Sequence, residues 1–200
     1  MKKSTIVTVV IALAALVAVL VGLFYYLISR PAQAENDVEA TEVEELIALN
    51  IEGDYPASPR GVVNLYSRYL TALYNEEYSE EQFGELITKM RIMFDEDLLT
   101  NNPEDEYYAS MQSDVNEYKQ KQWTIRNYTI PDTDEVTYKE IDKRKCALLT
   151  VSYFIKQGTS FAKSFQNYVL RKDDDGKWKI YGYSLKQSET VDENGNEIEE

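Results

Sequence analysis

Residues 146–185 read CALLTVSYFIKQGTSFAKSFQNYVLRKDDDGKWKIYGYSL, and this stretch decides the fold. Three runs in it, 146–155, 161–171 and 178–185, are rich in β-branched and aromatic residues, which is typical of strands. The last two runs are joined at 173–177, where Asp175-Gly176 favours a hairpin because Gly tolerates positive φ. Connections this short join antiparallel neighbours, so the stretch predicts an antiparallel meander.

Two more strands are predicted upstream of this stretch. From Trp123 the apolar pattern has a period of two, until Pro131 ends the run. A second run, 136–141, is separated from residue 146 by a short turn at 142–144. The predicted sheet therefore begins at Trp123.

Four helices are predicted before the first strand, at about 38–50, 59–76, 80–99 and 103–122, because apolar residues recur there at helical spacing. Start signals precede the last three of them. Ser58-Pro59 and Asn102-Pro103 each place a capping residue before a proline, and Ser79 with Gln82 forms a capping box.

Helices followed by a strand meander predict an α+β domain, in which helices cover one face of a curved, cone-like antiparallel sheet. On the last strand, alternation predicts that Trp178, Ile180, Gly182 and Ser184 share one face, with Phe165 or Tyr168 across from them. The acidic residues 187–200 contain almost no apolar side chains, so we expect a disordered tail.

The N-terminus contains an uncharged apolar run, residues 5–28, which is long enough to span a bilayer. Lys2 and Lys3 precede this run and only Arg30 follows closely, so the positive-inside rule places the N-terminus in the cytoplasm and the rest outside. The alternative is a signal peptide cleaved after Ala34, since Ala32-Gln33-Ala34 has the small-x-small pattern. The length of the apolar run favours a retained anchor.

The predicted organisation has four parts. Residues 1–30 are a membrane anchor with a short cytoplasmic start, and residues 31–52 are a linker with a peripheral helix. Residues 53–186 form the cone-like domain, and residues 187–200 form the tail. The expected location is the cell membrane, as a single-pass protein with an extracytoplasmic domain.

Charge restricts the partners of the outer part. All 35 acidic residues and 18 of the 21 basic ones follow Pro31, a net charge of −17. Nucleic acid is therefore not expected as a partner, because binding to phosphates requires a cationic surface. Apart from the membrane itself, we expect a protein partner or a second copy of the chain, with a small-molecule ligand as the alternative.

The residue types present argue against most catalytic sites. The chain has no histidine, the commonest general base and zinc ligand, and its single cysteine, Cys146, lies in a predicted strand and is interpreted as a buried structural thiol. The acidic clusters 95–97 and 173–175 do not match a calcium loop and are interpreted as solvated turns. No catalytic residue, cofactor or metal is therefore predicted.

Several segments nevertheless resemble a known family. They are 55–56, 58–63, 65–66, 73–76, 95–99, 101–103, 153–154, 168–173 and 176–183. On them the chain resembles an uncharacterised family of membrane-anchored proteins of Gram-positive gut bacteria, whose outer domain is similar to the nuclear-transport-factor-two-like (SnoaL-like) cone. The resemblance implies the fold and carries over no catalytic residue.

Three functions follow as hypotheses. The leading one is a non-catalytic module that binds a protein partner or self-associates through its exposed sheet. The second is a pocket for a small apolar ligand, and the third is an isomerase or hydratase that uses a Tyr/Asp pair. The candidate pocket or interface residues are Tyr66, Tyr69, Tyr153, Phe165, Tyr168, Trp178, Tyr181 and Tyr183.

Overall fold

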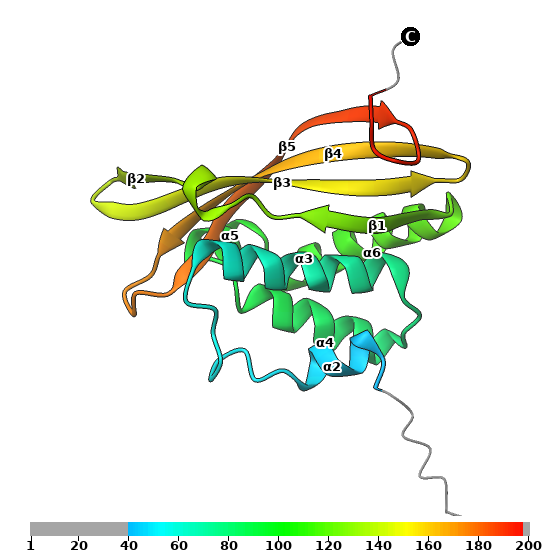
Figure 1. Ribbon diagram of the computed structural model, residues 1–200. Coiled ribbons are helices and arrows are strands. Elements are labelled where there is room, and N and C mark those ends of the chain that lie inside the picture. Colours follow the sequence, from blue (N-terminus) through cyan, green and yellow to red (C-terminus); the bar gives the residue numbers. More distant parts are fainter. Residues whose placement is uncertain (1–39, 198–200) are drawn as a thin grey trace, which may run out of the picture. The chain divides into compact units, whose positions relative to one another are not determined.

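The computed structural model describes residues 40–197, in which five α-helices precede five strands (Figure 1). The helices are α2 (Glu42–Ala48), α3 (Pro59–Asn75), α4 (Glu80–Arg91), α5 (Glu96–Asn101) and α6 (Glu104–Gln120). The strands are β1 (Trp123–Thr129), β2 (Thr137–Ile141), β3 (Arg144–Gln157), β4 (Ser160–Lys172) and β5 (Trp178–Val191), with a 3₁₀ turn, η1 (Thr133–Glu135), before β2. The predicted α+β class is confirmed.

The sheet is antiparallel with the order β1-β3-β4-β5, and β2 also pairs with β3. β3 is long enough to pair with β1 at one end, opposite Ser152–Gln157, and with β2 at the other. The turn at Asp142-Lys143 and the turn at Gly176 use positive φ angles, as tight hairpins require. The helices lie on one side of this sheet (Figure 1).

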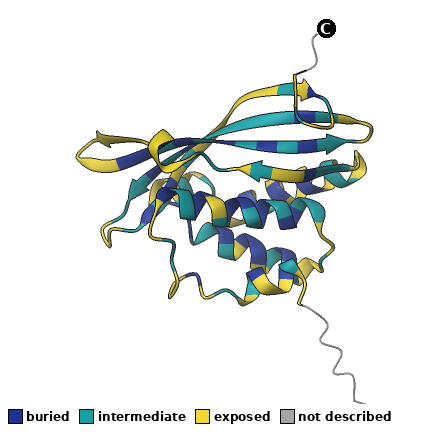
Figure 2. Cartoon of the chain, in the orientation of Figure 1, coloured by how far each residue is buried: buried dark blue, intermediate teal, exposed yellow. Residues whose placement is uncertain are grey.

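The central helix is α3, which packs against both the sheet and the other helices. Ser58 caps it by accepting a hydrogen bond from the Gly61 amide (3.1 Å), as predicted, and the Ser79/Gln82 capping box starts α4. Buried positions gather on the facing sides of the helices and the sheet (Figure 2). The core therefore lies between the helices and the sheet and continues between α2, α3 and α4.

The third predicted helix is wrong at its end. α4 stops at Arg91, and the chain then runs beside β5, where Ile180 donates to the Met93 carbonyl (2.8 Å) and the Asp95 amide donates to the Ile180 carbonyl (2.9 Å). Phe94 thus forms a parallel bridge with Ile180 instead of continuing a helical stripe. This strand-like contact forces a new helix, α5, to begin at Glu96.

The predicted start of the fourth helix is wrong in detail. α6 begins at Glu104 with Pro103 as its N-cap, and no side chain caps it. The Asn102 side chain instead donates to the Leu98 carbonyl at the end of α5 (2.9 Å). Because only Asn102 and Pro103 separate α5 from α6, the Asn102 side chain bonds a carbonyl group near the end of α5 and does not cap the start of α6.

The predicted disordered tail is also wrong over much of its length. β5 continues through Val191 and pairs with β4 as far as Phe161. A turn follows in which the Asp192 amide donates to the Asn196 carbonyl (2.9 Å), and Val191 is buried. Backbone pairing with β4 orders this segment despite its polar composition.

The predicted face of β5 changes at a β-bulge. Ile180 pairs with Leu170 and Gly182 pairs with Val169, so Tyr181 has no partner on β4. The extra residue shifts the alternation, and Tyr183, opposite Tyr168, takes the inward face that was predicted for Gly182 and Ser184.

The predicted membrane segment, residues 5–28, lies outside the described residues. Within residues 40–197, no helix is long and apolar enough to cross a membrane.

A buried ion pair joins the helical layer to the sheet. Asp95 is only 3% exposed and accepts from Arg171 Nε of β4 (2.9 Å), while Arg171 also bonds Asp97 (2.7 Å). Asp95 caps α5 as well, accepting from the Asp97 amide (3.0 Å). The interpretation of residues 95–97 as a solvated turn is therefore wrong for Asp95.

We predict that Arg171→Met lowers the free energy of unfolding by about 3 kcal/mol, because it leaves the Asp95 carboxylate buried without its counter-charge. Asp95→Asn keeps the helix cap, so the double variant should lose less than the two single variants together. Denaturant titrations measure each value.

The control is Glu77→Gln, which breaks the exposed ion pair with Lys119 and should change the free energy of unfolding by less than about 0.5 kcal/mol. Equal losses in Arg171→Met and the control would contradict the role of this pair.

Candidate functional site

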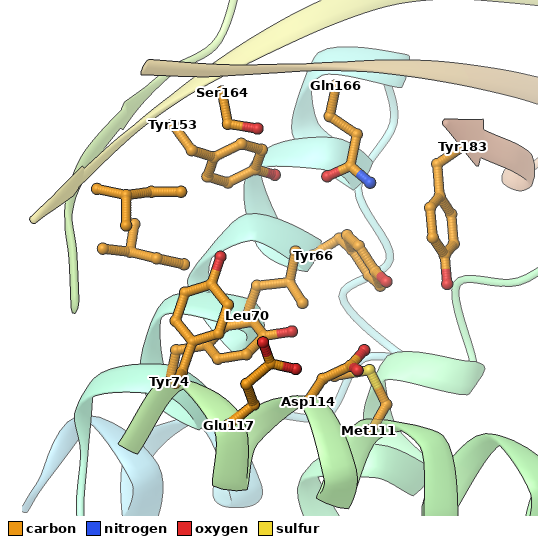
Figure 3. Close-up of a pocket in the computed structure, with 13 residues that line it drawn as sticks. Tyr66, Leu70, Tyr74, Met111, Asp114, Glu117, Tyr153, Ser164, Gln166 and Tyr183 are labelled. Atoms are coloured by element: carbon orange, nitrogen blue, oxygen red, sulfur yellow. The ribbon is translucent and has the colours of Figure 1, made fainter. Parts of the chain in front are cut away.

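A cavity of about 310 Å³ lies between α3, α6 and the inward face of the sheet (Figure 3). Its lining comes from three sources. α3 contributes Tyr66, Leu70 and Tyr74, α6 contributes Met111, Asp114, Glu117 and Tyr118, and the sheet contributes Ile125, Tyr153, Ile155, Ser164, Gln166 and Tyr183. The wall is thus rich in tyrosine and contains two carboxylates but no lysine or arginine.

Helical spacing explains how these side chains converge. Tyr66, Leu70 and Tyr74 are four residues apart and share one face of α3. On α6, Asp114 lies three residues after Met111 and four before Tyr118, so it shares the cavity face of that helix. Ser164 and Gln166 share the inward face of β4.

A chain of buried hydroxyl groups links the sheet to α3. The Tyr153 hydroxyl lies 2.7 Å from Ser67 Oγ and 2.8 Å from the Tyr168 hydroxyl. Tyr168 also donates to Gln166 Oε1 (3.4 Å), whose side chain borders the cavity. Burial raises the pKa of Tyr153 to about 12, so the hydroxyl stays protonated at neutral pH. It offers hydrogen bonds rather than a base.

The other cavity tyrosines are neutral for the same reason. Burial raises the pKa of Tyr66, Tyr74, Tyr118 and Tyr183 above the ordinary tyrosine value. The negative charge of Asp114 is a secondary cause for Tyr74 and Tyr183. Asp114 is therefore electrostatically close to both rings.

The two carboxylates have different surroundings. Glu117 forms an ion pair with Lys121, the C-cap residue of α6. No hydrogen bond or ion pair engages the Asp114 carboxylate within residues 40–197. Partial burial, and then the charge of Glu117, raise the pKa of Asp114 above its ordinary value. Among the described residues, Asp114 is thus the charged side chain of the cavity wall that has no counter-charge.

The structure separates the eight residues predicted for a pocket or interface. Tyr66, Tyr153 and Tyr183 line the cavity, and Tyr168 lies buried behind it, bonded to Tyr153. Tyr69 is on another face of α3, where its hydroxyl donates to the Leu46 carbonyl (2.7 Å).

The remaining three predicted residues do not reach the cavity. Trp178 is buried at the start of β5, with its ring 5.9 Å from that of Tyr138. Phe165 alternates with Ser164 and Gln166, so it lies on the outer face of β4. Tyr181 is the bulged residue, and its ring lies 4.4 Å from the Arg171 guanidinium.

Sequence reasoning missed Tyr74, Asp114, Glu117, Ser164 and Gln166 as a group. One signal was readable: Asp114 is an acid inside the otherwise apolar stripe of α6, flanked by Met111 and Tyr118. Asp114 is itself exposed, so the signal is its place between these two side chains and not its burial. Ser164 and Gln166 of β4 could not be recognised in this way, because the residues that surround them come from other parts of the chain and are brought together only by folding.

We predict that Asp114→Asn stabilises the protein at pH 7. The raised pKa means that the folded state disfavours the ionised carboxyl, so this penalty is present well above pH 3.8 and disappears as both states become protonated at lower pH. The gain should be modest, because solvent screens the partly exposed group. Thermal unfolding of both proteins between pH 3 and pH 8 measures it, with Asp174→Asn in the exposed hairpin as the control. A loss of stability at pH 7 would contradict the prediction.

Comparison with known proteins gives a family without an assigned activity. No curated protein matches the chain. Residues 1–183, which include the predicted membrane segment and all helices of the described part, match a family described as "Domain of unknown function (DUF6715)". Since this match covers most of the chain, the protein belongs to the DUF6715 family.

Proposed function

We propose that the chain is a membrane-anchored, extracytoplasmic module that binds a small ligand in the cavity between α3, α6 and the sheet. The observation that carries this proposal is the open cavity of about 310 Å³, near the lower end of the roughly 300–1,000 Å³ that is usual for ligand sites. A cone filled by aromatic side chains would have left only its surface for function.

The proposed location rests on the sequence of the N-terminus. The uncharged run at 5–28, with Lys2 and Lys3 before it, predicts an anchor that leaves the domain outside the cytoplasm. Helices on one face of a curved antiparallel sheet are compatible with the nuclear-transport-factor-two-like (SnoaL-like) cone, and the resemblance to membrane proteins of Gram-positive gut bacteria belongs to the same proposal.

Binding is proposed in preference to catalysis because of where the acid lies. A Tyr/Asp isomerase or hydratase requires a carboxylate deep in the cavity and close to a tyrosine hydroxyl. Asp114 lies in the wall, is exposed to solvent, and has no hydrogen bond to a tyrosine among the described residues. The tyrosine hydroxyls, with raised pKa values, are suited to hold a ligand.

A second candidate, self-association or protein binding through the sheet, is favoured by the edge of β5. Beyond the Phe94–Ile180 bridge, residues 181–190 pair only with β4 within the described part of the chain. Leu185 on this edge is 64% exposed. Unpaired strand edges with apolar side chains are templates for pairing with another strand.

For the ligand site, we predict that Ser164→Phe abolishes binding by filling the cavity. The test screens small fragments of positive, neutral and negative charge by ligand-observed NMR against the purified full chain. Ser184→Phe, which adds the same side chain to the outward face of β5, should bind like the native protein. Binding that survives Ser164→Phe, or the absence of any binding fragment, would argue against the cavity as a ligand site.

For the β5 edge, we predict that the chain forms dimers at high concentration and that Leu185→Lys dissociates them, because an edge lysine opposes strand pairing. Sedimentation velocity at several concentrations reports the oligomeric state. Self-repulsion between acidic domains should weaken the dimer at low salt. A chain that is monomeric throughout, or a dimer unaffected by Leu185→Lys, would rule out this edge as the contact.

A further inference from the structure

We infer that the ligand of this cavity is a compact organic cation, an amine or a quaternary ammonium, held against tyrosine rings with Asp114 as its counter-ion. The inference rests on the proposed ligand-binding function and specifies the ligand's chemistry. It follows from the composition of the wall, the state of Asp114 and the size of the space.

The wall is built of aromatic faces. Five tyrosines from α3, α6, β3 and β5 line the cavity, with ring centroids 4.4 Å apart for Tyr74 and Tyr118 and 6.0 Å apart for Tyr66 and Tyr183. A cation within about 6 Å of such a ring is attracted by the negative face of its π-system, and more strongly where water is excluded. Aromatic side chains from several elements around one space are the arrangement that quaternary ammonium ligands require.

Both charged side chains in the cavity wall are negative. Asp114 and Glu117 project from α6 toward the space bounded on its far side by Tyr153 and Gln166 (Figure 3). Glu117 already has Lys121 as a partner, whereas Asp114 has none among the described residues. A bound cation would supply the missing partner, and an anion would be repelled by the cavity and by the acidic chain as a whole.

The surroundings of Asp114 favour the same ligand. Burial disfavours the charged form of Asp114, as its raised pKa records. A neutral apolar ligand would exclude more water from the carboxylate and add to this penalty, whereas a cation would offset it. The volume of about 310 Å³ restricts the ligand to a small molecule rather than a peptide segment.

The test compares cations with neutral molecules of the same shape. The probes are choline against 3,3-dimethylbutan-1-ol, and benzylamine against benzyl alcohol, titrated calorimetrically into the full chain at low ionic strength. We expect the cation to bind at least about tenfold more tightly in one or both pairs, since a desolvated cation–π contact and a carboxylate partner together reach that factor. The preference should shrink as salt is added.

Substitutions identify which residues cause the preference for the cation over its neutral isostere. Asp114→Asn should lower the affinity ratio of cation to isostere several-fold, leaving the part that the tyrosine rings supply, while the neutral isostere binds as before. Glu117→Gln should have a smaller effect, because Glu117 already has Lys121 as a partner. Asp174→Asn removes the same charge from the exposed hairpin and should leave the ratio unchanged.

The outcomes separate this inference from the proposed function. Equal affinity within both pairs overturns the cation assignment and leaves a ligand site of other chemistry. A ratio that falls as much in Asp174→Asn as in Asp114→Asn also overturns it, since the preference would then be a general effect of charge. If none of the four probes binds, the cation assignment fails, and the fragment screen with Ser164→Phe decides separately whether the cavity binds anything.

Discussion

The structure depends on the contact between α3 and the inward face of the sheet, where polar groups are buried together with apolar ones. Ser67 and Tyr66 of α3 are buried, and a hydroxyl in that position costs roughly 1–3 kcal/mol if it lacks a hydrogen bond. Tyr153 of β3 reaches Ser67, and Tyr107 of α6 reaches Tyr66. No buried side-chain polar atom of the described residues lacks a partner. The position of α3 is thereby fixed by directional bonds as well as by packing.

A second constraint acts at the other end of the helical layer. The segment after α4 forms backbone hydrogen bonds with Ile180 of β5, and Arg171 of β4 forms an ion pair with Asp95. These contacts close the sheet against the helices near Phe94 and Ile180, where the side chains are fully packed. The cavity begins beside Phe94, whose ring lies 5.8 Å from that of Tyr66, and extends along the second half of α3 and the middle of α6. Packing near Phe94 and the space beyond it together shape this cavity.

The chemistry of that site follows from its construction. Tyrosine rings supply a large apolar surface, so the wall is only weakly polar. The hydroxyl groups of Tyr66 and Tyr153 form hydrogen bonds with residues behind the wall, which hold these two rings in place. Into this wall α6 brings Asp114, whose ionised form the fold disfavours. Residues that reduce stability where a cavity opens are typical of functional sites, because selection for binding tolerates a local penalty. The proposed cationic ligand would stabilise the ionised carboxylate of Asp114, and this interaction would contribute to the binding affinity.

The α+β class, all five strands and the serine caps of α3 and α4 can be predicted from the residues alone, because these features depend on local periodicity and on short-range hydrogen bonds. The sequence also placed Tyr66, Tyr153 and Tyr183 among the candidate site residues. Only the tertiary structure decided where α4 ends, since Met93 and Asp95 bond to a strand that lies more than 80 residues later. The bulge at Tyr181 likewise depends on the register between β4 and β5, and it alone turns Tyr183 inward. The cavity and its pairing of tyrosines with Asp114 arise from the space left between α6 and the sheet, a distance that no local pattern of residues encodes.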